Sequence, residues 1–213
     1  MAATGILFAD YAKHPKPTRL YLDSSFVTTL LFYELNKTNP AILKPKHHDS
    51  FAFYQTLLSD GVDLAGSILT YTEVLHHYCF YYPGGMYELA KKYFVTTGTI
   101  GGSTAHDKYK TFLKKDPVAC DAAWQTIAYR VAATEQFFSN HKIVLRSPLP
   151  SPFLTNVTKD VLNYASILKD AFVALEASDC VHLSLAHYLD SDAVATLDLG
   201  FLTADSFKVY YTN

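Results

Sequence analysis

Short apolar runs alternate along this chain with longer segments in which apolar side chains recur every three or four residues. Apolar runs of about four to eight residues are typical of buried strands. They predict strands at residues 19–22, 64–69, 142–145, 193–196 and 208–211. The longer segments predict helices at 26–35, 48–59, 70–82, 121–140, 160–175 and 179–188. This alternation indicates an α/β fold, with a central, mostly parallel sheet flanked by helices in a three-layer α/β/α arrangement.

The length and the breakers divide this fold into parts. A chain of 213 residues suits one domain, covering 1–213. Pro15 and Pro17 predict an extended arm at residues 1–18, ahead of the first strand. The breaker Pro83-Gly84-Gly85 opens a segment at about 83–118 that we interpret as an insertion into the fold.

The predicted insertion differs from the rest of the chain in charge. Between Met86 and Lys115 there are six lysines and two acids, a net charge of +4. The remainder carries twelve basic and eighteen acidic residues, a net charge of −6, so the whole chain stands at −2. This uneven distribution is more informative than the net charge of the whole chain, because it shows that positive charge is concentrated in one segment.

Cysteine usage and hydropathy indicate the compartment. Cys79, Cys120 and Cys180 are odd in number and lack a CxxC spacing, which favours buried free thiols in a reducing compartment. The first twelve residues do not have the pattern of a signal peptide. No apolar run approaches the ~18 residues that a membrane span needs. We therefore expect a soluble, cytoplasmic protein without a membrane partner.

Four acids stand where a predicted element begins or ends. Asp23 follows the first strand, Glu73 opens a helix, Asp179 opens the last predicted helix, and Asp198 follows the strand at 193–196. Because the carboxyl ends of parallel strands face one crevice, these acids are expected to lie close together. Like charges at close range are unfavourable unless a cation neutralises them. Hard oxygen ligands without a cysteine or a clear histidine partner select Mg²⁺ or Mn²⁺.

Each acid also has a purely structural interpretation. Asp23 and Asp179 could be helix N-caps. Thr70-x-x-Glu73 fits a capping box, and Asp198 could be a turn residue before Gly200. These roles do not exclude a metal site, and four such positions in one chain are less easily explained by chance.

In their order and spacing, four motifs resemble those of the PIN-domain ribonucleases, and most closely toxins of the VapC type. The motifs are Leu22-Asp23-Ser24-Ser25-Phe26, Thr70-Tyr71-Thr72-Glu73-Val74-Leu75, Asp179-Cys180-Val181-His182-Leu183-Ser184-Leu185-Ala186 and Thr196-Leu197-Asp198-Leu199-Gly200-Phe201. The resemblance covers most of the chain, although the chain is longer than such toxins usually are. It implies a metal-dependent endoribonuclease with Asp23, Glu73, Asp179 and Asp198 as its catalytic and metal-binding acids. Ser25 and Thr196 match the small polar positions beside these acids, and Asp205 is an alternative to Asp198.

Phosphodiester hydrolysis by such a cluster needs no side-chain nucleophile. Bound Mg²⁺ or Mn²⁺ would lower the pKa of a water molecule and polarise the phosphoryl oxygen. In this interpretation Asp23 and Asp179 hold the principal ion, and Glu73 and Asp198 complete its water shell or hold a second ion. The expected partners are RNA, an antitoxin protein and, in a homodimer, a second copy of the chain.

Other functions and contacts stay open at this level. A structure-specific DNA nuclease and a non-catalytic binding module are compatible with the same fold. A haloacid-dehalogenase-like phosphatase fits less well, because its chemistry needs Asp-x-Asp where this chain has Asp23-Ser24-Ser25.

Lysines and rings of the insertion suit single-stranded RNA, although a solvated surface would look the same. The candidate RNA contacts are Lys91, Lys92, Lys114 and Lys115, with Tyr87, Tyr93, Phe94, Tyr109 and Phe112 as stacking rings. The pairs His47-His48 and His76-His77 are interpreted as surface or packing residues. His182, one turn after Asp179, could hydrogen-bond near the acids or pack in the core.

Overall fold

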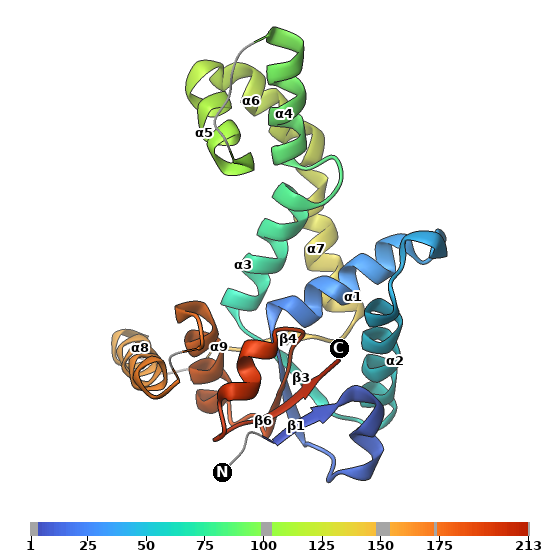
Figure 1. Cartoon of the computed structure of the whole chain (residues 1–213), viewed down its shortest axis with the longest axis vertical. Helices are drawn as coiled ribbons and strands as arrows, with labels where there is room; N and C mark the ends of the chain where they lie inside the picture. The colour runs from blue at the N-terminus through green and yellow to red at the C-terminus, as the bar shows by residue number, and fades with distance from the viewer. Residues whose placement is uncertain (1–3, 99–103, 148–153, 173, 213) are drawn as a thin grey trace. The chain divides into compact units, whose positions relative to one another are not determined.

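The computed structural model describes residues 4–98, 104–147, 154–172 and 174–212, and it divides into two compact units. Unit 1 comprises Met1–Tyr71 and Lys142–Asn213, and unit 2 comprises Thr72–His141. The predicted insertion at 83–118 lies within unit 2, and its residues 99–103 are outside the described residues. Figure 1 follows the chain through both units.

Unit 1 contains a sheet of six strands, and every strand pair in it is parallel. The order across the sheet is β1-β6-β5-β2-β3-β4. The strands are β1 (Thr4–Leu7), β2 (Arg19–Leu22), β3 (Asp63–Gly66), β4 (Val144–Leu145), β5 (Ala193–Ala195) and β6 (Lys208–Tyr211). With helices on its faces, this sheet confirms the predicted α/β class and the three-layer arrangement.

The alternation of side chains along the strands assigns each face to its helices. Tyr21 of β2 packs in one core with residues of α8 (Leu154–Ala171) and α9 (Ala177–Tyr188), such as Leu168 and Leu183. On β6, Val209 joins this core, whereas Tyr210 points to the other face and meets the ring of Phe53 at 5.5 Å. Phe53 belongs to α2 (Pro45–Ser59), which packs beside α1 (Ser24–Asn36). In Figure 1 these two helix pairs lie on opposite sides of the strands.

Residues 1–18, which were predicted to be an extended arm, contribute a strand and a helix. β1 pairs with β6 at the edge of the sheet, from Thr4 opposite Lys208 to Leu7 opposite Tyr211. The 3-10 helix η1 (Phe8–Lys13) follows, and it buries Phe8 and Tyr11 against α2. The prolines come after this helix, so they mark the connection to β2 and not the character of the whole segment.

Two other short elements complete unit 1. They are the 3-10 helices η2 (Pro40–Ile42) and η4 (Leu199–Thr203). The helix α3 (Ile68–His76) starts in unit 1 and crosses the unit boundary between Tyr71 and Thr72.

Unit 2 is helical in its described part. After α3 come the π-helical turn η3 (His77–Tyr81), α4 (Met86–Thr97), α5 (Ala105–Lys115), α6 (Pro117–Ile127) and α7 (Tyr129–Asn140). The single helix predicted at 121–140 is therefore wrong, because the chain turns at Ala128. There the N–H of Val131 donates to the carbonyl of Ala128 at 3.1 Å, a tighter bond than that of a continuous α-helix.

The three cysteines are free and buried as predicted, and the reducing compartment stays a prediction. They are Cys79, Cys120 and Cys180, and burial raises the pKa of each thiol. Among the residues described, no helix has both the length and the apolar character to cross a membrane.

Candidate active site

Asp23 lies at the carboxyl end of β2, and its side chain is almost fully buried, with the residue 3% exposed. Its Oδ2 accepts hydrogen bonds from the hydroxyls of Ser25 at 2.5 Å and Thr196 at 2.9 Å. The same oxygen accepts from the backbone N–H of Ser25 at 3.2 Å, which makes Asp23 the N-cap of α1. The capping role is therefore real, and it occupies one oxygen of a carboxylate that is already held by two hydroxyls.

Thr196 reaches Asp23 because β5 is the direct neighbour of β2. Leu22 pairs with Ala195, and the N–H of Asp23 donates to the carbonyl of Ala195 at 3.0 Å. The Thr196 hydroxyl in turn accepts from the N–H of Asp198 at 2.9 Å. Ser25 and Thr196 thus connect the loop after β5 to the first acid, as expected for residues that orient a site.

Asp198 stands at the start of η4 and is exposed. Its Oδ1 accepts from the N–H of Gly200 at 2.8 Å, so the predicted turn role is also present. A Cβ placed on Gly200 would lie 3.0 Å from Asp198 Oδ1 and 4.0 Å from Asp179 Oδ2. Gly200 therefore lets the two acids approach each other closely.

Asp179 is half-buried in the first turn of α9. It is not the N-cap of this helix; it lies three residues after the cap Glu176, whose N–H donates to Asp179 Oδ2 at 2.9 Å. Burial, and next the charges of Asp198 and Asp23, raise the pKa of Asp179, against the effect of the Glu176 N–H. Asp179 is therefore close enough to Asp23 and Asp198 for their charges to affect it, and the choice of Asp198 over Asp205 stays a prediction.

The three acids are not arranged as a ready-made metal cluster. Across the described ranges, no group of three or more His, Cys, Asp or Glu side chains has the geometry to hold a metal ion. Their chemistry nevertheless fits a hard divalent cation, because all the donors are carboxylate oxygens.

A group of hydrogen-bonded side chains lies behind Asp23, and the sequence alone does not predict it. His182 of α9 is buried, with its Nε2 3.6 Å from Asp23 Oδ1 and its Nδ1 2.7 Å from the hydroxyl of Tyr21. That hydroxyl also lies 2.8 Å from Ser67 Oγ and 3.1 Å from Thr70 Oγ1. Of the two interpretations of His182, both hold: it is a core residue, and it faces the acid. The sequence signal that could have predicted this contact is the alternation of side chains along β2, which places Tyr21 on the face of the sheet that α9 covers.

The capping box predicted for Thr70 and Glu73 is wrong, because α3 begins one turn earlier. Ser67 precedes the helix and exchanges hydrogen bonds with Thr70: the N–H of Thr70 donates to Ser67 Oγ at 3.2 Å, and the N–H of Ser67 donates to Thr70 Oγ1 at 3.3 Å. Glu73 lies three residues further on, in the part of α3 that belongs to unit 2. Its membership of the acidic cluster stays a prediction.

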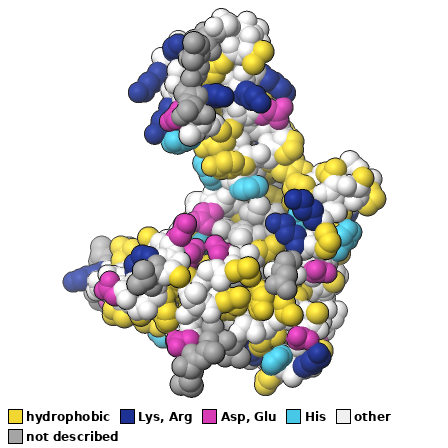
Figure 2. Space-filling model, in the orientation of Figure 1, with side chains coloured by type: hydrophobic (Ala, Val, Ile, Leu, Met, Phe, Trp, Pro, Cys, Tyr) yellow, Lys and Arg dark blue, Asp and Glu magenta, His cyan; other side chains and the backbone are white. Residues whose placement is uncertain are grey.

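The lysines predicted to contact RNA lie in unit 2, where Figure 2 shows basic side chains over α4 to α6. Lys91 and Lys92 are exposed on α4, and Lys92 pairs with Glu88 at 2.8 Å. Lys114 and Lys115 are exposed in the last turn of α5, where positive charge also suits the helix dipole. These positions agree with both the phosphate-contact and the solvated-surface interpretations.

Three of the aromatic rings that were expected to stack on bases are instead buried in unit 2. Tyr87, Phe94 and Phe112 are buried, and Phe112 is only 2% exposed. Tyr93 stacks on Phe112 with ring centroids 4.4 Å apart. The stacking interpretation is therefore wrong for these three buried rings, because unit 2 uses them to build its own core.

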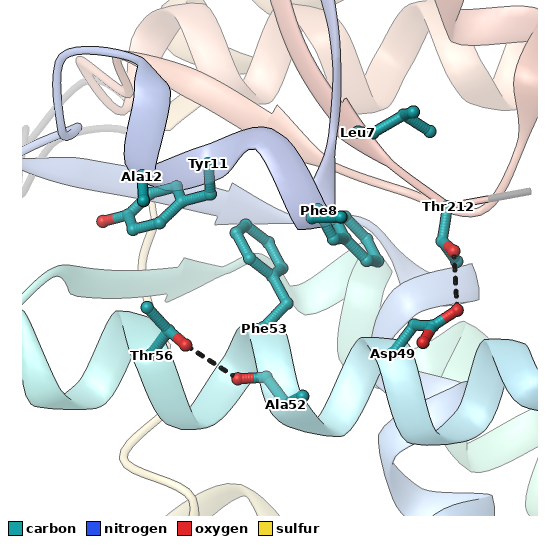
Figure 3. A pocket seen from close by; sticks show the side chains of 10 residues that line it. Leu7, Phe8, Tyr11, Ala12, Asp49, Ala52, Phe53, Thr56 and Thr212 are labelled. Atoms are coloured by element: carbon teal, nitrogen blue, oxygen red, sulfur yellow. Dashed lines mark hydrogen bonds between the residues drawn. The ribbon is translucent and has the colours of Figure 1, made fainter.

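A cavity of about 510 Å³ in unit 1 is lined by none of these acids. It lies between η1 and α2, where the rings of Phe8 and Phe53 stack at 4.2 Å (Figure 3). Three of its polar side chains are hydrogen-bonded: Thr212 donates to Asp49 at 3.3 Å, and Thr56 donates to the carbonyl of Ala52. Without a basic residue in its lining, this cavity is unsuited to a phosphate group.

Comparisons of this chain with protein-family models, with curated proteins and with solved structures found no match.

Proposed function

We propose that this protein is a Mg²⁺- or Mn²⁺-dependent endoribonuclease whose active site is built around Asp23, Asp179 and Asp198. The observation that carries the proposal is geometric: Thr196 hydrogen-bonds to Asp23 and to the N–H of Asp198, and a Cβ placed on Gly200 would lie 3.0 Å from Asp198 Oδ1 and 4.0 Å from Asp179 Oδ2. Acids in such an arrangement repel one another, and a divalent cation removes this repulsion. A carboxyl with a raised pKa, such as that of Asp179, close to acids at the carboxyl ends of parallel strands is also a common feature of functional sites.

The chain's own residues would divide the work of holding the ion. Asp23 Oδ2 is fixed by Ser25 and Thr196, while Asp179 and Asp198 present carboxylates beside Gly200. When bound, the cation supplies an activated water and shields charge on the phosphate. Glu73 is proposed as a fourth acid on the strength of the family resemblance.

His182 and Tyr21 are proposed to position the site. The imidazole lies against Asp23 on one side and the tyrosine hydroxyl on the other, so its orientation is fixed by contacts at both nitrogens. Tyr21 holds the imidazole by a hydrogen bond, and the imidazole contacts Asp23 at 3.6 Å; groups behind a metal ligand help to orient it.

The test is cleavage of matched oligonucleotides by the purified full-length protein. Labelled RNA and DNA of one sequence are incubated with Mn²⁺ or with chelator. Metal-dependent cutting of RNA alone is the expected result. Equal cutting of DNA would support the structure-specific DNA nuclease instead, and a lack of hydrolysis of either strand would support a binding module.

The toxin–antitoxin role rests on the resemblance to VapC-type toxins alone. If it is correct, a small protein encoded by a co-transcribed neighbouring reading frame should bind this chain and inhibit its cleavage of RNA. Co-purification of the two products, followed by the same cleavage assay, tests this part separately from the nuclease activity.

A further inference from the structure

Five aromatic and imidazole rings form a row in unit 2 that begins at its buried core and runs outward. The ring of His77 stacks on Tyr81 with centroids 5.6 Å apart, and Tyr81 meets the edge of Tyr87 at 4.7 Å. The hydroxyl of Tyr87 lies 3.3 Å from Nδ1 of His106 on α5. His76 joins the row from the side, 5.7 Å from Tyr81. We call these residues the ring row.

The π-helical turn creates this arrangement. In η3 the N–H of Tyr82 donates to the carbonyl of His77, five residues back, at 3.1 Å. In an α-helix the neighbours on one face are three or four residues apart. The wider turn brings His76 and Tyr81, which are five residues apart, into ring contact. Single π-turns are rare and occur frequently at functional sites.

Most of the ring row faces solvent. His76, His77 and His106 are exposed, and Tyr81 is 59% exposed. By contrast, Tyr87 is 8% exposed and anchors the row to the core rings of Phe80 and Tyr109. Rings that serve only to complete a core are buried. Because the outer members of the ring row are exposed, they are available to a ligand.

The charge around the row favours a polyanion with flat groups. Lys110 lies one turn after His106 on α5, so it adds positive charge to the face of the helix that carries this imidazole. Partial desolvation, and next the charge of His106, lower the pKa of His76; partial desolvation and then His76 lower the pKa of His77. A lowered pKa favours the uncharged imidazole, whose flat ring suits stacking, while Lys110 supplies positive charge. Aromatic rings beside basic groups are the usual platform for unpaired bases.

We propose that the ring row of unit 2 stacks unpaired bases of single-stranded RNA. Glu73 lies on α3 one turn before His76 and His77, so the row adjoins the proposed fourth acid along the same helix. This inference deepens the proposed function, on which it rests, by assigning a surface that recognises the unpaired substrate.

The experiment measures RNA binding in the absence of cleavage. The full-length Asp23→Asn protein, in chelator, is titrated into a fluorescein-labelled single-stranded RNA of about twelve nucleotides, and anisotropy is recorded. Adding Tyr81→Ala is expected to weaken binding about fivefold or more, as is usual when one stacking ring is removed. Adding Tyr81→Phe, which keeps the ring, should leave the affinity unchanged.

The matched control is Tyr129→Ala, because Tyr129 is a tyrosine of unit 2 with a similar exposure of 61% and lies outside the row. It should bind as the parent does. The loss in Tyr81→Ala should leave the salt dependence of binding unaltered, because no phosphate contact is removed. An RNA with abasic sites should bind the parent more weakly and should no longer distinguish it from Tyr81→Ala.

Two results would overturn the inference: undiminished binding by Tyr81→Ala, or a parent protein that does not bind the single-stranded RNA. Cleavage with Mn²⁺ by the protein with native Asp23 is scored separately. RNA cleavage combined with undiminished binding by Tyr81→Ala would refute the ring row and leave the proposed nuclease intact. No cleavage, combined with the expected loss of binding, would refute the nuclease and leave the ring row intact.

Discussion

The hydroxyl of Thr196 donates a 2.9 Å hydrogen bond to Oδ2 of Asp23 and accepts one of the same length from the N–H of Asp198. One side chain thereby links the end of β2 to the loop after β5. Because Thr196 is fully buried, neither bond can be replaced easily by water. The relative position of two proposed metal ligands thus depends on a residue that would not itself touch the metal.

Thr196→Val tests this dependence. Valine keeps the shape of threonine but removes the hydroxyl, so Asp23 loses a donor and the N–H of Asp198 loses its acceptor. We expect Mn²⁺-dependent RNA cleavage to fall by about 10- to 100-fold, the usual cost of losing a group that orients a metal ligand. The control is Thr134→Val, another fully buried threonine, whose hydroxyl bonds only to the Arg130 carbonyl in its own helix. Equal activity in the two variants would contradict the orienting role.

Removing one charge from either proposed ligand should abolish cleavage. Asp23→Asn and Asp179→Asn preserve the shape of the side chain and remove a carboxylate oxygen that a hard cation prefers. Activity is expected to fall by more than about 100-fold, a larger loss than that for an orienting neighbour. Circular dichroism checks that the variants are folded, and Asp205→Asn serves as the control. Cleavage at the wild-type rate by either ligand variant would remove that acid from the site.

The raised pKa of Asp179 predicts how stability depends on pH. A carboxyl whose pKa is raised on folding stabilises the folded state below its ordinary pKa of 3.8, and this stability is lost as the pH rises through the raised value. Metal-free wild type should therefore carry the full penalty at neutral pH. Asp179→Asn should relieve part of it, on the order of 1 kcal/mol, and should raise the melting temperature in chelator.

Added Mn²⁺ should reverse the order of the two melting temperatures. Binding to the folded state should stabilise the wild type by mass action and Asp179→Asn much less. Asparagine can still accept the N–H of Glu176, so the helix start is preserved in both proteins. Thermal melts in chelator and in excess Mn²⁺ provide the measurement. Identical melts in chelator, together with identical shifts on adding Mn²⁺, would argue against convergent acids.

Four of the lysines of unit 2 should control the salt dependence of RNA binding. Each lost phosphate contact lowers the log–log salt slope by roughly 0.7 for a single strand. We expect a smaller slope and weaker binding when serine replaces Lys91, Lys92, Lys114 and Lys115. A control with the same loss of charge in unit 1 replaces Lys13, Lys16, Lys37 and Lys46. A slope that falls equally in both proteins would mean that the unit 2 lysines are only a solvated surface.

Arg130 should be essential to the stability of unit 2. It is buried, and its guanidinium donates to the carbonyl of Tyr78 within the π-helical turn and to that of Pro83 just after it. Arg130→Met leaves both carbonyls without this donor, at a cost of about 1–3 kcal/mol for each buried group. Arg130→Lys should recover only part of the loss, because an ammonium lacks the planar fork that spans two acceptors. Fluorescence of Trp124, the single tryptophan, reports the unfolding of this unit; unchanged stability in Arg130→Met would contradict the assignment.

The sequence by itself determined the features that depend on local periodicity. Apolar runs of strand length, alternating with amphipathic segments, were sufficient to predict the α/β class and the approximate positions of β2, β3, β5 and β6. Acids placed directly after strands predicted that Asp23 and Asp198 would lie near each other, because parallel strands end at one edge of a sheet. The small hydroxyl residues beside them, Ser25 and Thr196, were expected only from the resemblance to the PIN-domain motifs.

The tertiary structure decided what depends on long-range pairing and packing. The N-terminal segment became an edge strand because β6, some two hundred residues later, offers it a partner. Tyr87, Phe94 and Phe112 resemble stacking residues in the sequence, yet they are buried because the helices of unit 2 need a core of their own. The contact of His182 with Asp23 likewise exists only because α9 packs on the face of β2 that carries Tyr21. Local patterns record which residues prefer burial, whereas the partner that buries each residue is set by contacts between distant parts of the chain.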